Sequence, residues 1–302
     1  MGGVAPVVLA GAHRSGTTLA VRMLDALGLF TGAQRDPNLE SYFFLRRNEW
    51  LLRQAGGSWD RPEPLRQQLA ESSGLEAARA ACSQQVRSLR FAGYAGKRSM
   101  LLRRGTRGER GPWGWKDPRN TFTFEAWAGV FGGARLVVFE RNGVDVAESL
   151  CRRQREVQAS GVAAPSPSAS ALLRLDEPLE PYVVHSERCG TWEGAFALWE
   201  EYAAAGRALF DRYDGPKLRV RFEELVAKPL EQLRLLAEFC GLSPTEAALQ
   251  QACAEVEPAR GSSFCRDPEL SARYEAVRET PVMQQLGYDT AAPSPAADGG
   301  VQ

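Results

Sequence analysis

The sequence predicts an α/β protein in which helices flank a central parallel sheet. Short apolar runs of strand length alternate along the 302-residue chain with longer segments whose apolar residues recur at helical spacing. This alternation is typical of parallel strands joined by helical crossovers. The first apolar run is followed by Gly11 and Gly16, five residues apart, and then by a helical segment that begins at Thr17. Because this is the spacing of a phosphate-binding loop, we expect a three-layer P-loop-type fold.

The amino-terminal third of the chain supplies the first predicted elements. The apolar run Pro6–Ala10 predicts a strand, and apolar residues at helical spacing predict a helix over Thr17–Leu27. Charged and apolar residues mixed at steps of three and four predict two further helices, at 40–55 and 75–91. The segment 56–62, which contains two glycines and a proline, has the composition of a loop.

The middle of the chain repeats the alternation of strand and helix. A short strand is predicted at Trp113–Trp115 and a buried one at Arg135–Phe139, with a helix near Thr121–Val130 between them. Later elements follow the same reasoning, and we expect helices at 144–156, 191–213, 229–240 and 244–254 and a strand at Leu218–Phe222.

Length and composition indicate a single domain. With 302 residues and 44% apolar content the chain can bury one large core, which we place at 1–290. We expect 156–188 to form a variable loop or lid, because its centre at 160–170 is rich in Ala, Pro and Ser. The segment 291–302 has a similar composition and is predicted to be a disordered tail.

The charge balance bears on the class of partner. Lys plus Arg and Asp plus Glu number 37 each, so no global basic field favours binding to nucleic acid or to an anionic membrane. Met1–Val4 lacks a basic leader, and the apolar run Val4–Ala10 is too short to span a bilayer, so we expect a cytoplasmic protein. The six cysteines form no CxxC pair and have no nearby histidine cluster, which favours reduced packing residues over a zinc site.

The glycine-rich loop favours an anion other than a nucleoside triphosphate. Backbone N–H groups between Gly11 and Gly16 can bind an anion at the start of the helix. A triphosphate loop places Lys directly after the second Gly, where this chain has Thr17. The basic residue is Arg14, inside the loop, whose planar guanidinium can bind an anion at two points. A diverged kinase is therefore the weaker interpretation.

A second anion site is predicted after the buried strand. Arg141 follows that strand directly, and Ser149 comes eight residues later, about two turns along the next helix. Asn142 and Gly143 can make the turn between strand and helix. Glu140 and Arg141 stand where an NTPase would carry its magnesium-binding Asp, so we expect no metal requirement.

Together these motifs resemble the PAPS-dependent sulfotransferase family, whose donor is 3′-phosphoadenosine 5′-phosphosulfate (PAPS). In that family an Arg-Ser-Gly-Thr-Thr loop binds the 5′-phosphosulfate, and an Arg and a Ser eight residues apart bind the 3′-phosphate. The sequence is most similar to a bacterial-type branch, through three motifs that occur in the same order: His13–Thr17, Trp115–Arg119 and Leu198–Tyr202. The similarity extends from about Val7 to Tyr288.

The resemblance implies a set of donor-binding residues. Arg260 and Gly261 are similar to a basic loop that closes over the 3′-phosphate. The full set is Gly11, His13, Arg14, Ser15, Gly16, Thr17, Thr18, Arg141, Ser149, Arg260 and Gly261. Two features depart from the family: Gly143 replaces the usual proline of the turn, and Glu140 adds a carboxylate near the phosphate site.

The reaction implied by the resemblance transfers a sulfuryl group from PAPS to the hydroxyl of a small molecule, carbohydrate or lipid. Lys116 and Arg14 would supply positive charge to the transferred group. The cytosolic branch has a His base two residues after this Lys, where the present chain has Pro118. Glu40, Asp117 and His13 are the remaining candidates for the general base. Carbohydrate sulfotransferases often place a Glu before an aromatic pair, and the resemblance to them favours Glu40.

Some alternatives stay open at the level of sequence. A catalytically silent nucleotide-binding or scaffold protein is compatible with the departures at the turn. Helical spacing around Trp50, Trp127 and Trp199 indicates core packing, whereas Trp59 lies in a Gly-rich loop and is the tryptophan that could stack on a ligand. The residues select neither the acceptor nor an oligomeric state.

Overall fold

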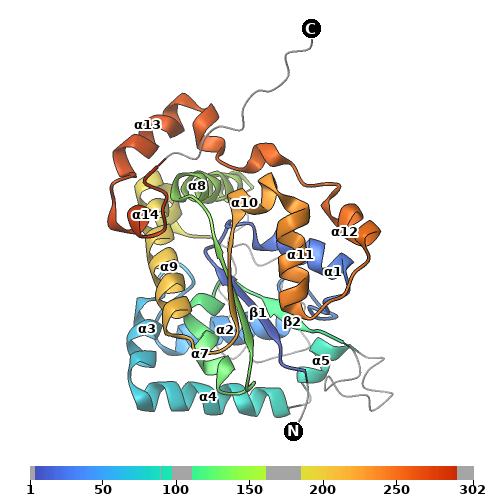
Figure 1. The fold of residues 1–302 in the computed structure, drawn as a ribbon. Helices are drawn as coiled ribbons and strands as arrows, with labels where there is room; N and C mark the ends of the chain where they lie inside the picture. The colour runs from blue at the N-terminus through green and yellow to red at the C-terminus, as the bar shows by residue number, and fades with distance from the viewer. Residues whose placement is uncertain (1–3, 89, 97–110, 161–184, 291–302) are drawn as a thin grey trace.

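The structure is a computed structural model that describes residues 4–88, 90–96, 111–160 and 185–290 (Figure 1). Its centre is a four-stranded, all-parallel sheet with the strand order β2-β1-β3-β4. The predicted α/β class with a parallel sheet is therefore confirmed. The strands are β1 (Val7–Gly11), β2 (Gly114–Lys116), β3 (Arg135–Glu140) and β4 (Lys217–Arg221).

Helices make up most of the remaining described chain. The first group is α1 (Thr17–Ala26), α2 (Tyr42–Gln54), α3 (Glu63–Ala70), α4 (Ser72–Arg87), α5 (Phe91–Ala95), α7 (Asn120–Ala128) and α8 (Gly143–Ala159). The second group is α9 (Trp192–Arg212), α10 (Phe222–Ala227), α11 (Pro229–Cys240), α12 (Glu246–Cys253), α13 (Pro268–Val277) and α14 (Pro281–Gln285). Three short 3₁₀ turns complete the set: η2 (Glu187–Gly190), η3 (Pro258–Arg260) and η4 (Ser263–Arg266).

The two faces of the sheet pack against different helices. Side chains alternate across a strand, so Val7 and Leu9 of β1 belong to a core formed with α1, α11 and α12. Val8 and Ala10 point the other way, into a larger core formed with α2, α7, α8 and α9. Figure 1 shows α1 and α11 on one side of the sheet and α7 and α9 on the other. This arrangement gives the three layers that the sequence predicts.

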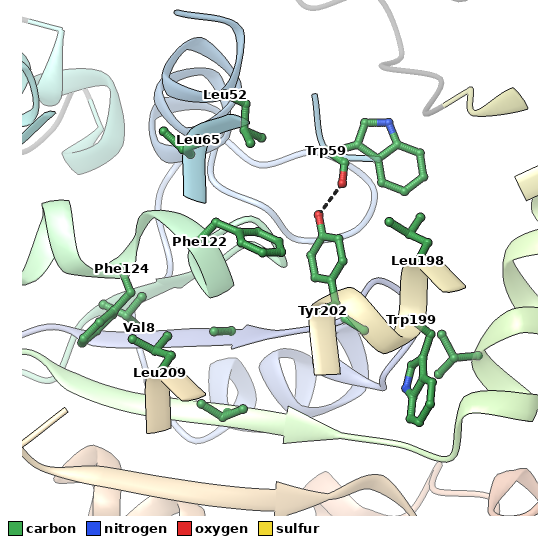
Figure 2. Close-up of a cluster of buried hydrophobic side chains, with 14 of the residues drawn as sticks. Val8, Leu52, Trp59, Leu65, Phe122, Phe124, Leu198, Trp199, Tyr202 and Leu209 are labelled. Carbon is green, nitrogen blue, oxygen red and sulfur yellow. Dashed lines mark hydrogen bonds between the residues drawn. The ribbon is translucent and has the colours of Figure 1, made fainter. Parts of the chain in front are cut away.

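The larger core is rich in aromatic residues. Phe44 stacks on Trp115 with the ring centroids 3.7 Å apart, and Trp127 packs edge-on against both rings. Trp127 and Trp199 are buried and Trp50 packs against this core, so the prediction that these three serve in packing is confirmed. Figure 2 shows the part of this core in which the Tyr202 hydroxyl donates a hydrogen bond to the carbonyl of Trp59 at 2.7 Å.

Several predicted helix boundaries are wrong. The helix expected at 75–91 is α4, which begins three residues earlier and ends four residues earlier than predicted. Helices α3, α5, α10, α13 and α14 were not predicted. Three of these five helices, α3, α13 and α14, carry Pro in their first turn, where it has no hydrogen bond to lose. The centre of the predicted lid, 161–184, and the predicted tail, 291–302, lie outside the described residues.

Strand order determines where the functional loops meet. Strands β1 and β3 are adjacent, and Gly11 at the end of β1 pairs in register with Phe139 of β3. The loop that follows β1 and the segment that follows β3 therefore leave the sheet side by side. The chain continues from β1 toward β2 on one side and from β3 toward β4 on the other, and this switch point is where open α/β sheets bind ligands.

In the described residues, none of the helices has the length and apolar character that crossing a membrane requires. The six cysteines are free thiols, and four of them are buried: Cys82, Cys151, Cys189 and Cys240. They act as packing residues, as predicted.

Candidate active site

The phosphate loop between β1 and α1 depends on its two glycines. Gly11 has φ 134° and Gly16 has φ 89°, a region that L-residues other than Gly rarely adopt. A Cβ on Gly11 would lie 2.5 Å from the carbonyl oxygen of Phe139, and one on Gly16 would overlap the ring of Phe222. Gly16 immediately precedes α1, so the N–H groups of the first helical turn, which lack intrahelical partners, face outward from the loop. This is the geometry of an anion-binding helix N-terminus.

The two predicted anion sites are joined by side-chain contacts. Arg14 Nε donates to Ser149 Oγ at 2.8 Å, so the loop after β1 contacts α8 directly. Arg141 Nη1 donates to the carbonyl of Arg14 at 3.1 Å, and Nη2 donates to the carbonyl of Arg260 at 3.3 Å. The Arg141 guanidinium also lies over the Phe222 ring, 4.3 Å from its centroid. Segments more than 100 residues apart in the sequence thus form one basic surface.

This surface lines a cavity of about 500 Å³. Ten of the predicted residues line it: His13, Arg14, Gly16, Thr17, Thr18, Glu40, Lys116, Arg141, Ser149 and Arg260. Gly11, Ser15, Asp117 and Gly261 do not line it. Ser15 instead donates its hydroxyl to the carbonyl of Ala12 at 2.7 Å, which fixes the shape of the loop from inside.

Sequence reasoning missed part of the cavity wall. Arg152 and Arg153 of α8 line the cavity, as do Asp36 and Asn38 from the segment before α2. The two arginines follow Ser149 by three and four residues, and residues at these spacings share one face of a helix. This spacing could have identified Arg152 and Arg153 from the sequence. Asp36 and Asn38 lie in a loop, for which no periodic pattern exists.

The cavity has an excess of arginine charge at the α8 wall. Burial lowers the pKa of Arg14, and the nearby Arg152 and Arg141 lower it further. Burial, followed by the charge of Arg14, lowers the pKa of Arg153 to about 10. Within the described chain neither Arg14 nor Arg153 has a carboxylate ion pair. Crowded, partly desolvated arginines are stabilised by an anionic ligand.

Glu40 and Lys116 form an ion pair on the wall of the cavity. Lys116 Nζ donates to Glu40 Oε1 at 2.9 Å, and the two side chains are 2% and 7% exposed. The backbone that leads to Glu40 is constrained at two points: Leu39 has a strained φ of 63°, and the Glu40 N–H donates a 2.7 Å hydrogen bond to Asp36. These constraints fix the position from which the Glu40 side chain lines the cavity. Burial alone would raise the pKa of Glu40, but Lys116 and Arg119 outweigh it and hold the pKa below its ordinary value of 4.5. Glu40 is therefore ionised at neutral pH.

Asp117 lies behind this pair and is fully buried. Its carboxylate accepts hydrogen bonds from Arg119 Nη1, from the Arg119 N–H, both at 2.9 Å, and from Asn48 Nδ2 at 2.9 Å. Burial raises the pKa of Asp117 to about 6, against the opposing charge of Arg119. Because Asp117 does not line the cavity, its geometry suits holding other groups in place.

His13, in the phosphate loop, also lines the cavity. Its ring packs against Trp59 with a centroid distance of 4.7 Å and against Tyr202 with a distance of 5.6 Å. Burial and the charges of Arg119 and Arg153 lower the pKa of His13 well below 6.5, so the imidazole is neutral. Trp59 is buried beneath His13 and does not line the cavity, so this tryptophan is a packing residue.

In the described part of the chain, no group of three or more His, Cys, Asp or Glu side chains is arranged to hold a metal ion. The cavity is lined by four carboxylates, Asp36, Glu40, Asp145 and Glu148, and by a larger number of cationic side chains, together with hydroxyls and helix N–H groups. Cationic side chains, hydroxyls and helix N–H groups are what proteins use to bind phosphate and sulfate.

Comparison with known proteins agrees with this chemistry. Residues 6–246 match the model of the sulfotransferase family. The chain belongs to this family. Membership supports the transfer of sulfuryl groups as its general activity.

Solved structures similar to this sulfotransferase are distant in sequence. They include the sulfotransferase domain of the olefin synthase from Synechococcus PCC 7002, at 19% identity, 97% of each chain covered and a TM-score of 0.45. A sulfotransferase domain from the curacin biosynthetic pathway has 18% identity, covers 96% of this chain and 97% of its own, and has a TM-score of 0.47. A sulfotransferase from Alicyclobacillus acidocaldarius has 15% identity, coverage of 94% and 96%, and a TM-score of 0.46. No curated protein matched the chain.

The structure explains the departure at the turn of this sulfotransferase. Asn142 caps α8 by accepting a hydrogen bond from the Val144 N–H at 2.9 Å. A Cβ on Gly143 would lie 2.5 Å from the Trp199 ring, whose Nε1 donates to the carbonyl of Arg141 at 3.0 Å. A Gly and Trp pair thus fixes this turn at the position where the resemblance leads us to expect proline.

Glu140, the second departure, points away from the cavity. Its carboxylate lies 3.7 Å from Arg219 of the neighbouring strand β4, and Glu140 is not among the residues that line the cavity. The carboxylate therefore adds no negative charge to the surface on which Arg141 and Ser149 meet.

Proposed function

We propose that this sulfotransferase binds PAPS and transfers its sulfuryl group to the hydroxyl of a small-molecule, carbohydrate or lipid acceptor, releasing 3′,5′-adenosine diphosphate. The observation that carries the proposal is that one cavity joins three groups: the phosphate loop, the Arg141 and Ser149 pair, and the Glu40 and Lys116 pair. A donor with phosphates at both ends of its ribose requires the first two groups. An acceptor hydroxyl requires the third.

PAPS fits the chemistry of the residues present. The N–H groups at the start of α1, with Thr17, Thr18 and Arg14, would hold the 5′-phosphosulfate. Arg141 and Ser149 would hold the 3′-phosphate, and Arg260 contributes a further positive charge to that end of the cavity. Bound PAPS supplies an activated sulfuryl group, so the protein needs to position two reactants and balance charge.

The chain's own residues account for the remaining steps. The acceptor oxygen forms a bond to sulfur while the bond between sulfur and the phosphate oxygen breaks. Glu40 accepts the proton that leaves the acceptor hydroxyl, because it is ionised and lines the cavity. Lys116 and Arg14 offset the negative charge on the transferred group and on the leaving phosphate.

The charge balance of the chain supports the remaining parts of the proposal. We infer a single sulfotransferase domain over 1–290 that acts in the cytoplasm and requires neither nucleic acid nor membrane. Equal numbers of acidic and basic residues, 37 of each, leave the cavity as the local basic surface that a small anionic ligand would find.

Calorimetric titration with two nucleotides tests the proposal. We expect 3′,5′-adenosine diphosphate to bind about 10- to 100-fold more tightly than adenosine 5′-monophosphate, because the latter leaves Arg141 and Ser149 without a phosphate. Equal affinities would show that no 3′-phosphate site exists. Release of 3′,5′-adenosine diphosphate from PAPS in the presence of an acceptor then separates an active enzyme from a silent nucleotide-binding protein.

A further inference from the structure

Arg119, at the start of α7, has a buried position behind the active site that the proposed reaction does not use directly. Its side chain is 0% exposed and does not line the cavity. The guanidinium contacts three carboxylates: Asp117 Oδ1 at 2.9 Å, Glu49 Oε2 at 3.1 Å and Glu40 Oε2 at 3.3 Å. A buried arginine with three carboxylate partners is fixed in position, because any movement would leave a buried charge without a partner.

The two oxygens of Glu40 have different partners. Oε1 accepts from Lys116, which lines the cavity, and Oε2 accepts from Arg119, which does not. An anionic ligand in the cavity can compete with Glu40 for the lysine. It has no access to the arginine.

Arg119 is itself held from two further sides. Asp117 accepts hydrogen bonds from both the guanidinium and the backbone N–H of Arg119, and Asn48 donates to the other oxygen of Asp117. Glu49 accepts from Arg119 Nε and forms an ion pair with Arg53 at 3.0 Å on its outer side. The planar guanidinium can satisfy these partners at once, which the single nitrogen of a lysine cannot do.

We propose that Arg119 is the positioning residue for Glu40, holding the carboxylate ionised and directed at the cavity when Lys116 turns to the sulfuryl group. The proposal rests on the proposed role of Glu40 as the base. Lys116 has two roles that compete, as partner of Glu40 and as ligand of the donor. Arg119 has only the first, so it keeps Glu40 in place through the reaction.

Replacement of Arg119 by Met tests this through the titration of Glu40. Carbon-13 NMR of the side-chain carboxyl, assigned by its absence in Glu40→Gln, reports the pKa without any acceptor. Removing a positive charge at this distance should raise the pKa of Glu40 by about one to three units. Since only ionised Glu40 can accept a proton, the rate of PAPS consumption should then fall at a correspondingly higher pH as the solution is acidified.

Two further variants guard against loss of folding and against general effects on the network. Arg119→Lys keeps the charge but cannot serve three carboxylates, so PAPS turnover with water or any acceptor should fall about tenfold or more while the dissociation constant of 3′,5′-adenosine diphosphate is unchanged. Arg53→Lys, which alters a contact to Glu49 and none to Glu40, should leave the pKa of Glu40 and the rate unchanged.

The outcomes separate this inference from the proposed function. A folded Arg119 variant with an unchanged Glu40 pKa and an unchanged rate would overturn the positioning role. A wild-type protein that does not bind 3′,5′-adenosine diphosphate would instead overturn the donor assignment, and the NMR titration of Glu40 would still decide whether Arg119 controls that carboxylate.

Discussion

At the residue scale, Arg141 connects the parts of the proposed donor site. It donates to the carbonyls of Arg14 and Arg260 and stacks on Phe222, so its guanidinium is already directed before a ligand arrives. Asp145 lies 3.5 Å from the same guanidinium and its carboxylate accepts from the N–H groups of Ser263 and Phe264. The carboxyl-terminal turns are thereby joined to the anion site.

Replacing Arg141 by Ala should weaken donor binding. A charge-assisted contact to the 3′-phosphate contributes about 1.5 to 3 kcal/mol, which corresponds to roughly 10- to 100-fold in the dissociation constant of 3′,5′-adenosine diphosphate. Calorimetric titration measures the change. Arg219→Ala is the matched control, since Arg219 pairs with Glu140 outside the cavity and its loss should leave the constant unaltered. A folded Arg141 variant with full affinity would place the 3′-phosphate elsewhere.

Glu40 and Asp117 are expected to respond differently to removal of their charge. Glu40→Gln keeps the shape of the side chain but not its basicity, so turnover should fall by about 10² to 10⁴ with donor binding retained. Because the pKa of Glu40 is lowered, acidification from pH 8 should first protonate Asp117, whose pKa is about 6, and cause only the partial loss of rate expected of Asp117→Asn, with the larger loss at lower pH where Glu40 is protonated. Asp117→Asn should lose less activity, since Asp117 acts through Arg119. Near-normal turnover in Glu40→Gln with collapse in Asp117→Asn would transfer the role to Asp117.

The residues proposed to contact phosphate could be identified from the sequence because they occur in motifs with fixed spacing. Gly11, Gly16, Arg141 and Ser149 were each found from their distance to a predicted strand. The network behind Glu40 was not found, because its members come from α2, β2 and α7, and only the tertiary fold brings them together. No local pattern in a sequence reports contacts between residues about 70 positions apart.

At the element scale, the turn from β3 into α8 depends on close packing between Gly143 and Trp199. Gly at the first position of a helix is normally less favourable than Ala. Here Gly143→Ala should destabilise the protein, because the new Cβ would lie 2.5 Å from a buried ring that has no room to move. We expect a loss of about 1 to 3 kcal/mol in the free energy of unfolding.

Denaturant titration of Gly143→Ala measures this loss. Gly132→Ala is the control, since a Cβ there meets no atom within 4 Å. Because the same turn carries Arg141, the Gly143 variant should also bind 3′,5′-adenosine diphosphate more weakly. Stability equal to that of the wild type would show that the turn adapts without Trp199.

The strands and most of the long helices could be predicted from the sequence, and the shortest helices could not. Strands β1 and β3 are continuous apolar runs, and α1, α9 and α11 carry clear helical periodicity. Helix α14 has five residues and α10 has six, too few for a period to appear. For α13 a signal was present and was not used: Asp267 before Pro268 is a capping residue followed by proline in the first turn.

At the scale of the whole molecule, a chain with no net charge concentrates arginines around one cavity. Of the four acidic residues that line the cavity, Glu40 and Asp145 pair with Lys116 and Arg141 within the site, and Glu148 pairs with Arg155. The attraction for an anion is therefore local, and salt screens it less where the charges are partly buried. A small ligand with several phosphates gains from this arrangement, whereas the zero net charge of the chain offers no general attraction for an extended polyanion.

This distribution of charge predicts how the melting temperature responds to nucleotides. A ligand that binds only the folded state stabilises it by about 2.7 kcal/mol at a hundredfold excess over its dissociation constant, so 3′,5′-adenosine diphosphate should raise the melting temperature by a few degrees. The increase should persist in EDTA, because arginines, hydroxyls and N–H groups bind the phosphates directly. ATP with magnesium should do less, since Thr17 stands where a triphosphate loop has its lysine and ATP has no 3′-phosphate for Arg141. Equal or greater stabilisation by ATP with magnesium would favour the kinase interpretation, because the phosphate loop would then bind a triphosphate without the usual lysine.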